Sequence, residues 1–240
     1  MRPAKAHPHE TRRRTPRTAA RAAATARNGG TAAANEERGL TARGLETRRR
    51  IVSAARTVFE ESGFVEARIS DIAKHAGSAN GSFYTYFDSK EDILEAVAMD
   101  VFDELEAAFH LSETTDPRTA IENVNRQYFD TWMRNRKMLM TLYQVSGFLP
   151  EVFTRLTQSH ELHGKRIAER LRQLQHEGLV DNDLDANHAA VALGSMVEQS
   201  LRWWIGQGHP FDPEVALATL NKMSIRAIGL DDRRGFRTTS

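Results

Sequence analysis

From residue 46 to about residue 229, apolar side chains recur at the three- and four-residue spacing of α-helices. The first apolar stripe consists of Ile51, Ala55, Val58 and Phe59. No segment shows the two-residue alternation of a half-buried strand, and no internal repeat is present. The pattern therefore predicts an all-α chain of about nine helices.

Polar residues before several stripes mark helix starts. Ser89 is followed three residues later by Asp92, which approximates a capping box. Asp116-Pro117 and Asp212-Pro213 each place a capping carboxylate directly before a proline in the first helical turn. These signals predict a connecting helix at about 89–110 and two of the helices that follow it.

Residues 69–90 carry the most specific pattern of the chain. Two short helical segments flank Gly77, and the second ends in an aromatic cluster that includes Phe83 and Phe87. Two short helices joined by a tight turn predict a helix-turn-helix, whose second helix fits the major groove of DNA. Phe83 and Phe87 are four residues apart, so we expect both in the core of this unit.

Composition and charge separate the N-terminal segment from the rest. Residues 1–45 carry ten Lys/Arg and three Glu, a balance of +7, whereas residues 46–240 have a balance of −6. Because the first segment has almost no apolar side chain larger than alanine before Leu40, we expect it to be disordered. It is either a solvated leader or a cationic arm that adds salt-dependent affinity for DNA.

Several protein classes find little support in the sequence. The absence of cysteine excludes disulfides and thiolate metal sites. No apolar run approaches the roughly 20 residues that span a bilayer, and no apolar stretch follows the basic N-terminus as in a signal peptide. We therefore predict a cytoplasmic protein that does not enter a membrane.

Catalytic and metal-binding motifs are also weak. His160 and His163 are three residues apart on one helix face, but no third ligand follows at a matching spacing. The acidic loop at 181–185 lacks the glycine and the later glutamate of a calcium loop. We predict no enzymatic activity, no metal and no cofactor.

The predicted three-helix head at about 46–87 resembles the TetR (tetracycline-repressor) family of bacterial transcription regulators. The matching residues are Gly63-Phe64, Ile72-Ala73, Ala76-Gly77, Gly81, Phe83-Tyr84, Tyr86-Phe87 and Ser89-Lys90. The resemblance covers the head closely and the rest of the chain only in the order and length of its helices. It implies a ligand-responsive homodimer, most simply a repressor that a small effector releases from a pseudo-palindromic operator.

The resemblance also implies which residues meet DNA: Arg68, Ser78, Asn80, Gly81, Ser82, Tyr84, Thr85, Tyr86 and Lys90. Asn80 and Ser82, with Thr85 as a third, are expected to read bases. Both tyrosines and Lys90 are expected at phosphates. Arg68 replaces the usual capping threonine and is expected either to contact a phosphate or to lie along the surface.

Two residues of this set keep alternative roles. Gly81 either lets the backbone approach DNA or packs against the first helix. Ser78 is expected to take over the cap of the second helix, because Ser78-Ala79 replaces the usual Val-Ser.

Large, adaptable apolar side chains gather in the middle helices, near a Gly-Phe-Leu-Pro break at 147–150. Core packing explains any one of them, but as a group they predict a cavity between helices for a mostly apolar effector. The candidate ligand-binding residues are Phe129, Trp132, Met133, Met140, Tyr143 and Phe148.

The last two helices are predicted to form a dimer interface, because their stripes mix large and small residues as packing between two subunits requires. The candidate residues are Leu193, Val197, Trp204, Leu217 and Leu220. Trp203 and Trp204 are adjacent and cannot both enter one core. At least one is therefore expected to meet a partner, unless one ring simply lies exposed on the surface.

The predicted organisation is a basic arm at 1–45, a helix-turn-helix domain at 46–90, a helical ligand-binding and dimerisation domain at 91–230 and a flexible tail at 231–240. The predicted partners are double-stranded operator DNA, a second copy of the chain and a small apolar effector. The alternative is an all-helical enzyme or small-molecule carrier with an incidental helix-turn-helix head.

Overall fold

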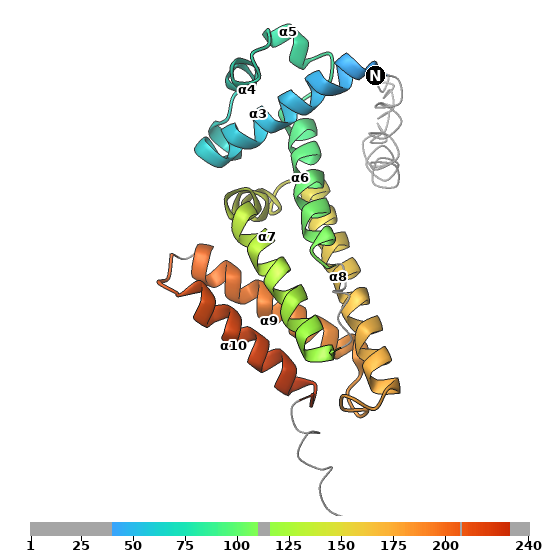
Figure 1. Cartoon of the computed structure of the whole chain (residues 1–240). Helices are drawn as coiled ribbons and strands as arrows, with labels where there is room; N and C mark the ends of the chain where they lie inside the picture. Colours follow the sequence, from blue (N-terminus) through green and yellow to red (C-terminus); the bar gives the residue numbers. More distant parts are fainter. Residues whose placement is uncertain (1–39, 110–115, 207, 231–240) are drawn as a thin grey trace, which may run out of the picture. The chain divides into compact units, whose positions relative to one another are not determined.

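The computed structural model describes residues 40–109, 116–206 and 208–230, which form eight helices and no strands (Figure 1). The all-α prediction is confirmed, with eight described helices against about nine expected. Most of the predicted basic arm and all of the predicted tail at 231–240 lie outside the described residues. Within the described ranges, no helix has the length and apolar character needed to cross a membrane.

The head is formed by α3 (Ala42–Glu66), α4 (Ile69–His75) and α5 (Asn80–Phe83). The first of these helices begins four residues before the expected start and continues past Gly63, where the backbone bends at a φ of 73°. Gly77 turns the chain between α4 and α5 with a φ of 61°, a conformation that glycine adopts without steric cost.

Aromatic side chains fill the core of the head, as expected. Phe83 is fully buried and Phe87 nearly so, with their ring centroids 5.7 Å apart. Phe59 and Phe64 of α3 are also buried and contact each other, with ring centroids 5.6 Å apart. Because α5 is only four residues long, this packing, rather than its own hydrogen bonds, fixes the helix.

The body contains α6 (Lys90–Ala107), α7 (Pro117–Val145), α8 (Pro150–His176), α9 (Ala186–Gly206) and α10 (Pro213–Ala227). The three predicted caps are present. The Ser89 hydroxyl accepts a hydrogen bond from the Asp92 amide at 3.0 Å. The Asp116 carboxylate accepts one from the Thr119 amide at 3.0 Å, and the Asp212 carboxylate accepts one from the Val215 amide at 3.1 Å.

Two apolar clusters hold these helices together. The larger one extends from the head through α6 and α7, and the smaller one joins the end of α8 to the start of α9 and to Ile228. The helix α9 packs along α8, and α10 packs against α7 (Figure 1). This arrangement places α7, α8, α9 and α10 around the cavity of the body.

Candidate nucleic-acid interface and effector cavity

The outer side of α5 is polar and exposed, whereas Phe83 points into the core. Asn80, Gly81 and Thr85 are exposed and Ser82 is partly exposed. The side chains predicted to read bases are therefore available at the surface, Asn80 and Ser82 on α5 and Thr85 in the turn that follows it.

Gly81 has open space where a side chain would be. A Cβ atom built on this residue meets no other atom within 4 Å in the described part of the chain. The alternative that Gly81 packs against the first helix is therefore wrong, because no neighbour requires its small size. The glycine instead leaves bare backbone on the outer side of α5.

The predicted cap by Ser78 is wrong. The N-cap position of α5 is occupied by Ala79, which has no side-chain oxygen to accept a hydrogen bond. The Ser78 hydroxyl donates instead to the carbonyl of Ala73, at 3.4 Å across the turn. Ser78 thus holds the turn between the two helices, and the recognition helix begins without a side-chain cap.

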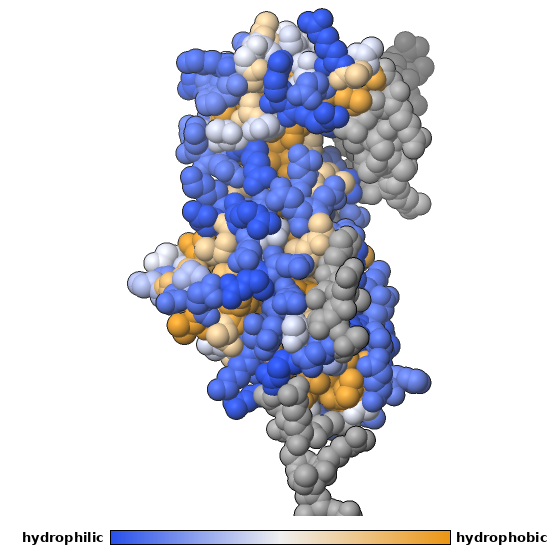
Figure 2. Space-filling model, viewed as in Figure 1, coloured by the Kyte–Doolittle hydropathy of each residue, from blue (hydrophilic) through white to orange (hydrophobic). Residues whose placement is uncertain are grey.

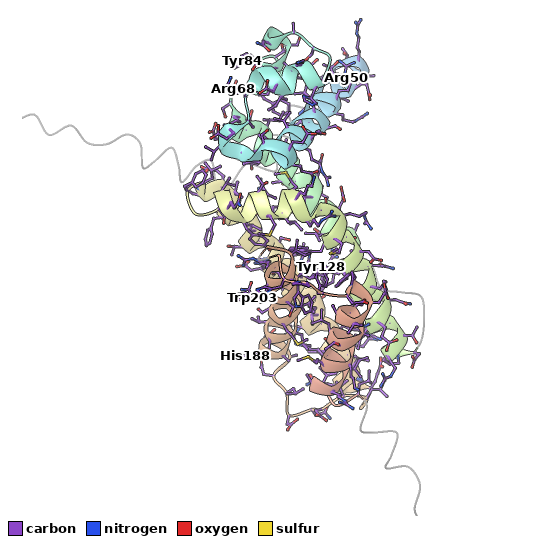
Figure 3. The ribbon with its side chains drawn as sticks, turned by 90° about the vertical axis from the view of Figure 1, so that its left-hand side faces the viewer. Arg50, Arg68, Tyr84, Tyr128, His188 and Trp203 are labelled. Atoms are coloured by element: carbon purple, nitrogen blue, oxygen red, sulfur yellow. The ribbon has the colours of Figure 1, made fainter. Side chains whose placement is uncertain are left out.

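Tyr84 and Arg68 are both exposed, and Figure 3 shows them on the same side of the head. Tyr84 is 58% exposed and rests one ring edge on Phe83, with the centroids 5.3 Å apart. Arg68 occupies the N-cap position of α4 and makes no capping hydrogen bond. Tyr86 differs, because its ring is partly buried against the core.

We expected Lys90 to be an exposed phosphate ligand, but its side chain is bonded within the protein. Its ammonium group donates to the carbonyls of Val65 and Ala67, both at 3.0 Å, and lies 4.6 Å from the centroid of the Phe64 ring. Carbonyls at a helix C-terminus lack partners within the helix and attract cations. Lys90 therefore fastens the start of α6 to the end of α3.

A buried amide that sequence reasoning missed joins the head to the body. Asn135 of α7 is 0% exposed, and its oxygen accepts a hydrogen bond of 2.5 Å from Arg56 of α3. Its nitrogen donates to Glu104 of α6 at 2.8 Å and to the Thr131 carbonyl at 2.9 Å. Arg56 also donates to Glu104 at 3.2 Å. Three helices therefore share one hydrogen-bond network.

A cavity of about 840 Å³ lies within the body and is lined by α7, α8, α9 and α10, together with Phe109. This volume is within the range of small-molecule sites in proteins. Its wall includes the aliphatic side chains of Ile121, Val124, Leu171 and Leu193, and the aromatic ring of Tyr128. The cavity is therefore largely apolar, in agreement with the kind of effector that the sequence indicated.

None of the six predicted ligand-binding residues lines this cavity. Phe129 and Trp132 belong to the main core, and Met133, Met140 and Tyr143 pack against that core. Phe148 is 57% exposed. These residues are corrected to core and surface roles, because the sequence shows which side chains are apolar but not where their packing leaves space.

The polar groups of the cavity include His160 and His163, the two histidines that the sequence places on one helix face. His163 is 8% exposed, stacks on Phe109 with centroids 4.3 Å apart and meets Tyr128 edge to face. Burial, with smaller contributions from the positive charges of His160 and Arg166, lowers the pKa of His163 to about 4. The imidazole is therefore neutral at physiological pH.

The second histidine belongs to a hydrogen-bonded group. His160 lies 2.9 Å from the carboxylate of Glu198, which also accepts a hydrogen bond from the Tyr143 hydroxyl. Burial acts to raise the pKa of Glu198, but these hydrogen bonds hold it below its ordinary value. Glu198 therefore remains a carboxylate with its partners in place.

Residues 40–109, 116–206 and 208–230 contain no group of three side chains arranged to hold a metal.

The family model for "Bacterial regulatory proteins, tetR family" matches residues 51–97, which contain α4, α5 and the adjoining parts of α3 and α6. The HTH-type transcriptional regulator TtgR of Pseudomonas putida is 27% identical over 169 residues, or 67% of this chain and 80% of that protein. The head is a TetR-family DNA-binding domain. The chain is accordingly a helix-turn-helix transcriptional regulator.

Solved structures of TetR-family regulators share the fold. A regulator from Mesorhizobium loti superposes with a TM-score of 0.66 at 21% identity, covering 78% of this chain and 97% of that one. The fatty acid degradation regulator FadR of Bacillus halodurans gives a TM-score of 0.61 at 22% identity, covering 74% and 93%. Both likenesses extend well beyond the head, so the helical body also shares the fold of these two regulators.

The residues predicted for a TetR-type dimer interface mostly face inward. Leu217 and Leu220 are buried within the protomer, and Leu193 and Val197 line the cavity. Trp204 is partly buried and stacks on Phe211. The assignments of Leu217 and Leu220 are corrected, because the protomer itself buries these two side chains.

Other apolar side chains of α9 and α10 are exposed: Val191, Trp203, Val215 and Met223. Trp203 is 59% exposed, stacks on His209 and lies on the outer side of the body (Figure 3). Figure 2 shows that the face in view is largely hydrophilic, with hydrophobic patches on the body. Of the two adjacent tryptophans, the protomer thus leaves Trp203 exposed and Trp204 partly buried.

Proposed function

We propose that this chain is a homodimeric repressor that reads a pseudo-palindromic operator with α5 and leaves it when a mostly apolar effector occupies the cavity. The observation that carries the proposal is the exposed polar side of α5. Gly81 leaves the backbone bare on this side, and the exposed ring of Tyr84 follows directly after the helix. A surface of this kind suits close approach to the edges of base pairs and to phosphates.

Roles at the DNA interface follow from exposure. Asn80 and Ser82 are the proposed base readers, and Thr85 contributes a methyl group that suits the methyl of thymine. Tyr84 and Arg68 are the proposed phosphate ligands, because both are exposed on the head. In a dimer, two copies of α5 would enter successive major grooves about one helical turn apart.

The proposed effector response depends on α6. Arg166 lines the cavity and donates to the Glu106 carboxylate of α6 at 2.5 Å. The same helix begins at Lys90, which is fastened to the end of α3. An effector that binds one arrangement of α6 more tightly shifts the population of head positions, and only that difference in affinity drives the release.

The proposed dimer surface consists of the exposed apolar side chains Val191, Trp203, Val215 and Met223 on α9 and α10. Helices from two subunits that pack on these side chains would form a four-helix contact. Because a two-fold axis repeats one surface, the pairing is self-complementary and produces the symmetry that a pseudo-palindrome requires.

The test is selection of bound sequences from a random duplex pool, followed by affinity measurements on the selected site and on a scrambled duplex. Asn80→Ala should reduce the ratio of the two affinities by roughly 5- to 100-fold, the effect of one bidentate base contact. Tyr84→Phe should weaken binding to both duplexes alike, because it removes a phosphate contact only.

Asn182→Ala is the matched control, because Asn182 is an exposed asparagine in the loop that follows α8. It should leave both affinities unchanged. Selection that yields no preferred sequence, or an Asn80→Ala protein with an intact preference, would contradict the proposal and favour the carrier alternative.

A further inference from the structure

One face of α8 is basic where it lines the cavity. His160, His163, Arg166 and Arg170 lie at spacings of three, three and four residues, so they share one side of the helix. All four line the cavity. We call these four residues the basic face of α8. Any role of this face in effector binding rests on the proposed function, because the effector is assigned to the same cavity.

Carboxylates neutralise only part of the basic face. Glu198 holds His160, and Glu106 holds Arg166. Arg170 donates to the side-chain oxygen of Gln173 at 2.7 Å, and no carboxylate in the described part of the chain lies within ion-pair distance of it. Among the described residues, the guanidinium group of Arg170 therefore lines the cavity without a carboxylate partner.

Two nitrogens of the basic face also lack hydrogen-bond partners. His163 Nε2 and Arg170 Nε are buried, and neither has a partner among the described residues. An arginine Nε can only donate, so the partner that is missing at Arg170 is an acceptor. A buried donor without an acceptor costs free energy, which a suitable ligand atom would recover.

The charges around the basic face favour an anionic acceptor. The groups that act on His163 most strongly after burial are His160 and Arg166, and both contribute positive charge. Glu161 and Glu169 are exposed, so solvent screens them, and Glu198 is already bonded to His160 and Tyr143. Tyr128 on α7 is kept neutral, because burial raises its pKa.

We propose that the effector is an apolar acid, whose hydrocarbon skeleton fills the cavity and whose carboxylate lies against the basic face of α8 and accepts from Arg170. The opposite wall supplies aliphatic and aromatic contacts, including Ile121, Val124 and Tyr128. A buried charge-assisted hydrogen bond contributes about twice as much as a neutral one, so the acid group, more than the skeleton, selects the ligand.

The test compares acids with their uncharged methyl esters by titration calorimetry on the full chain. Decanoate and methyl decanoate form the aliphatic pair, and 2-naphthoate and methyl 2-naphthoate form the aromatic pair. In at least one pair, the acid should bind roughly tenfold or more tightly than its ester. Which pair shows the difference distinguishes an aliphatic from an aromatic effector.

Matched variants locate the acid group. Arg170→Met keeps an unbranched apolar stem but removes the guanidinium group and its charge, and it should reduce binding of the acid by roughly tenfold while binding of the ester is retained. Arg172→Met is the control, because Arg172 is exposed and bonded to Asn187 outside the cavity. His163→Phe provides a second variant, which should also reduce the ratio of the affinity for the acid to the affinity for the ester.

Esters that bind as tightly as acids, or equal losses in Arg170→Met and Arg172→Met, would overturn this inference. Failure of all four probes to bind would overturn it as well. The selected operator should be measured with the same preparations. Sequence-specific DNA binding that persists would show that the regulator function stands although the effector class is wrong.

Discussion

Packing within the described part of the protomer does not require a glycine at position 81. Its open surroundings mean that Gly81→Ala creates no clash in the free protein, and alanine is the better helix former by about 1 kcal/mol. We therefore expect unchanged or slightly higher thermal stability together with weaker operator binding, because the added methyl group would separate the backbone from DNA. Calorimetry and fluorescence anisotropy measure the two effects.

Gly164→Ala provides the comparison, since Gly164 of α8 also has no neighbour within 4 Å of an added Cβ atom. This variant should gain stability and retain its affinity for the operator. If Gly81→Ala loses stability, or binds DNA as the parent protein does, the role assigned to Gly81 is wrong.

His163 should make stability depend on pH. Its pKa is lowered on folding to about 4, so the unfolded chain binds more protons between that value and its ordinary pKa near 6.5. Stability therefore falls as the pH falls through this window, by on the order of 2–3 kcal/mol for this group. Urea unfolding at pH 7 and pH 4.5 should show this loss in the parent protein but not in His163→Phe.

His176→Gln is the control for that experiment, because His176 is an exposed histidine at the end of α8. It should retain the pH dependence of the parent protein. Parallel losses of stability in the parent and in His163→Phe would show that other groups account for the acid sensitivity.

Between helices, the joint formed by α3, α6 and α7 depends on one buried amide. Asn135→Ala removes an acceptor for Arg56 and a donor to Glu104, which leaves two charged groups without a shared partner. We expect a loss of about 2–3 kcal/mol in the free energy of unfolding. Denaturant titration measures the loss.

The neighbouring change Arg136→Ala tests whether any substitution on this part of α7 has the same effect. Arg136 is exposed, and its one hydrogen bond to the described residues is to the Met133 carbonyl of its own helix. Its loss should cost no more than about 0.5 kcal/mol. Similar losses in both variants would remove the special role of Asn135.

Helices and their starts were largely predictable, because caps and apolar stripes are local signals. Ser89, Asp116 and Asp212 cap the helices that the sequence assigned to them. The prediction failed at Ser78, where the hydroxyl found a carbonyl across the turn. It also failed at the start of α3, because the Ala42–Leu45 segment continues the helix without an apolar stripe to announce it.

At the scale of the whole molecule, the predictable part was smaller. An apolar stripe shows that a helix face is buried but not whether its own protomer or a second copy covers it. Leu217 and Leu220 are covered within the protomer, whereas Trp203 is left outside. The residues that line the cavity could not be predicted for a similar reason, because side chains from four different helices together define the cavity.

The proposed dimer surface predicts a specific change of assembly. Trp203→Glu places a charge on the exposed apolar face of α9 without disturbing the core of the protomer, because the indole is mostly exposed. We expect a monomer in sedimentation velocity, with operator affinity reduced at least tenfold since the second head is lost.

Phe148→Glu is the matched control for the dimer prediction. Phe148 is equally exposed but precedes α8, outside the proposed surface. The variant should remain dimeric. If Trp203→Glu also remains a dimer, the contact between subunits lies elsewhere on the molecule.

Glu104 and Glu106 stand two residues apart in the last turns of α6, and they bond to different neighbours. Glu104 holds the Arg56–Asn135 pair, and Glu106 holds Arg166 at the wall of the cavity. Because both carboxylates belong to the same part of α6, a movement of this segment alters both contacts together. Coupling between two binding sites is reciprocal, so a bound operator should lower the affinity for the effector by the same factor by which the effector lowers the affinity for the operator.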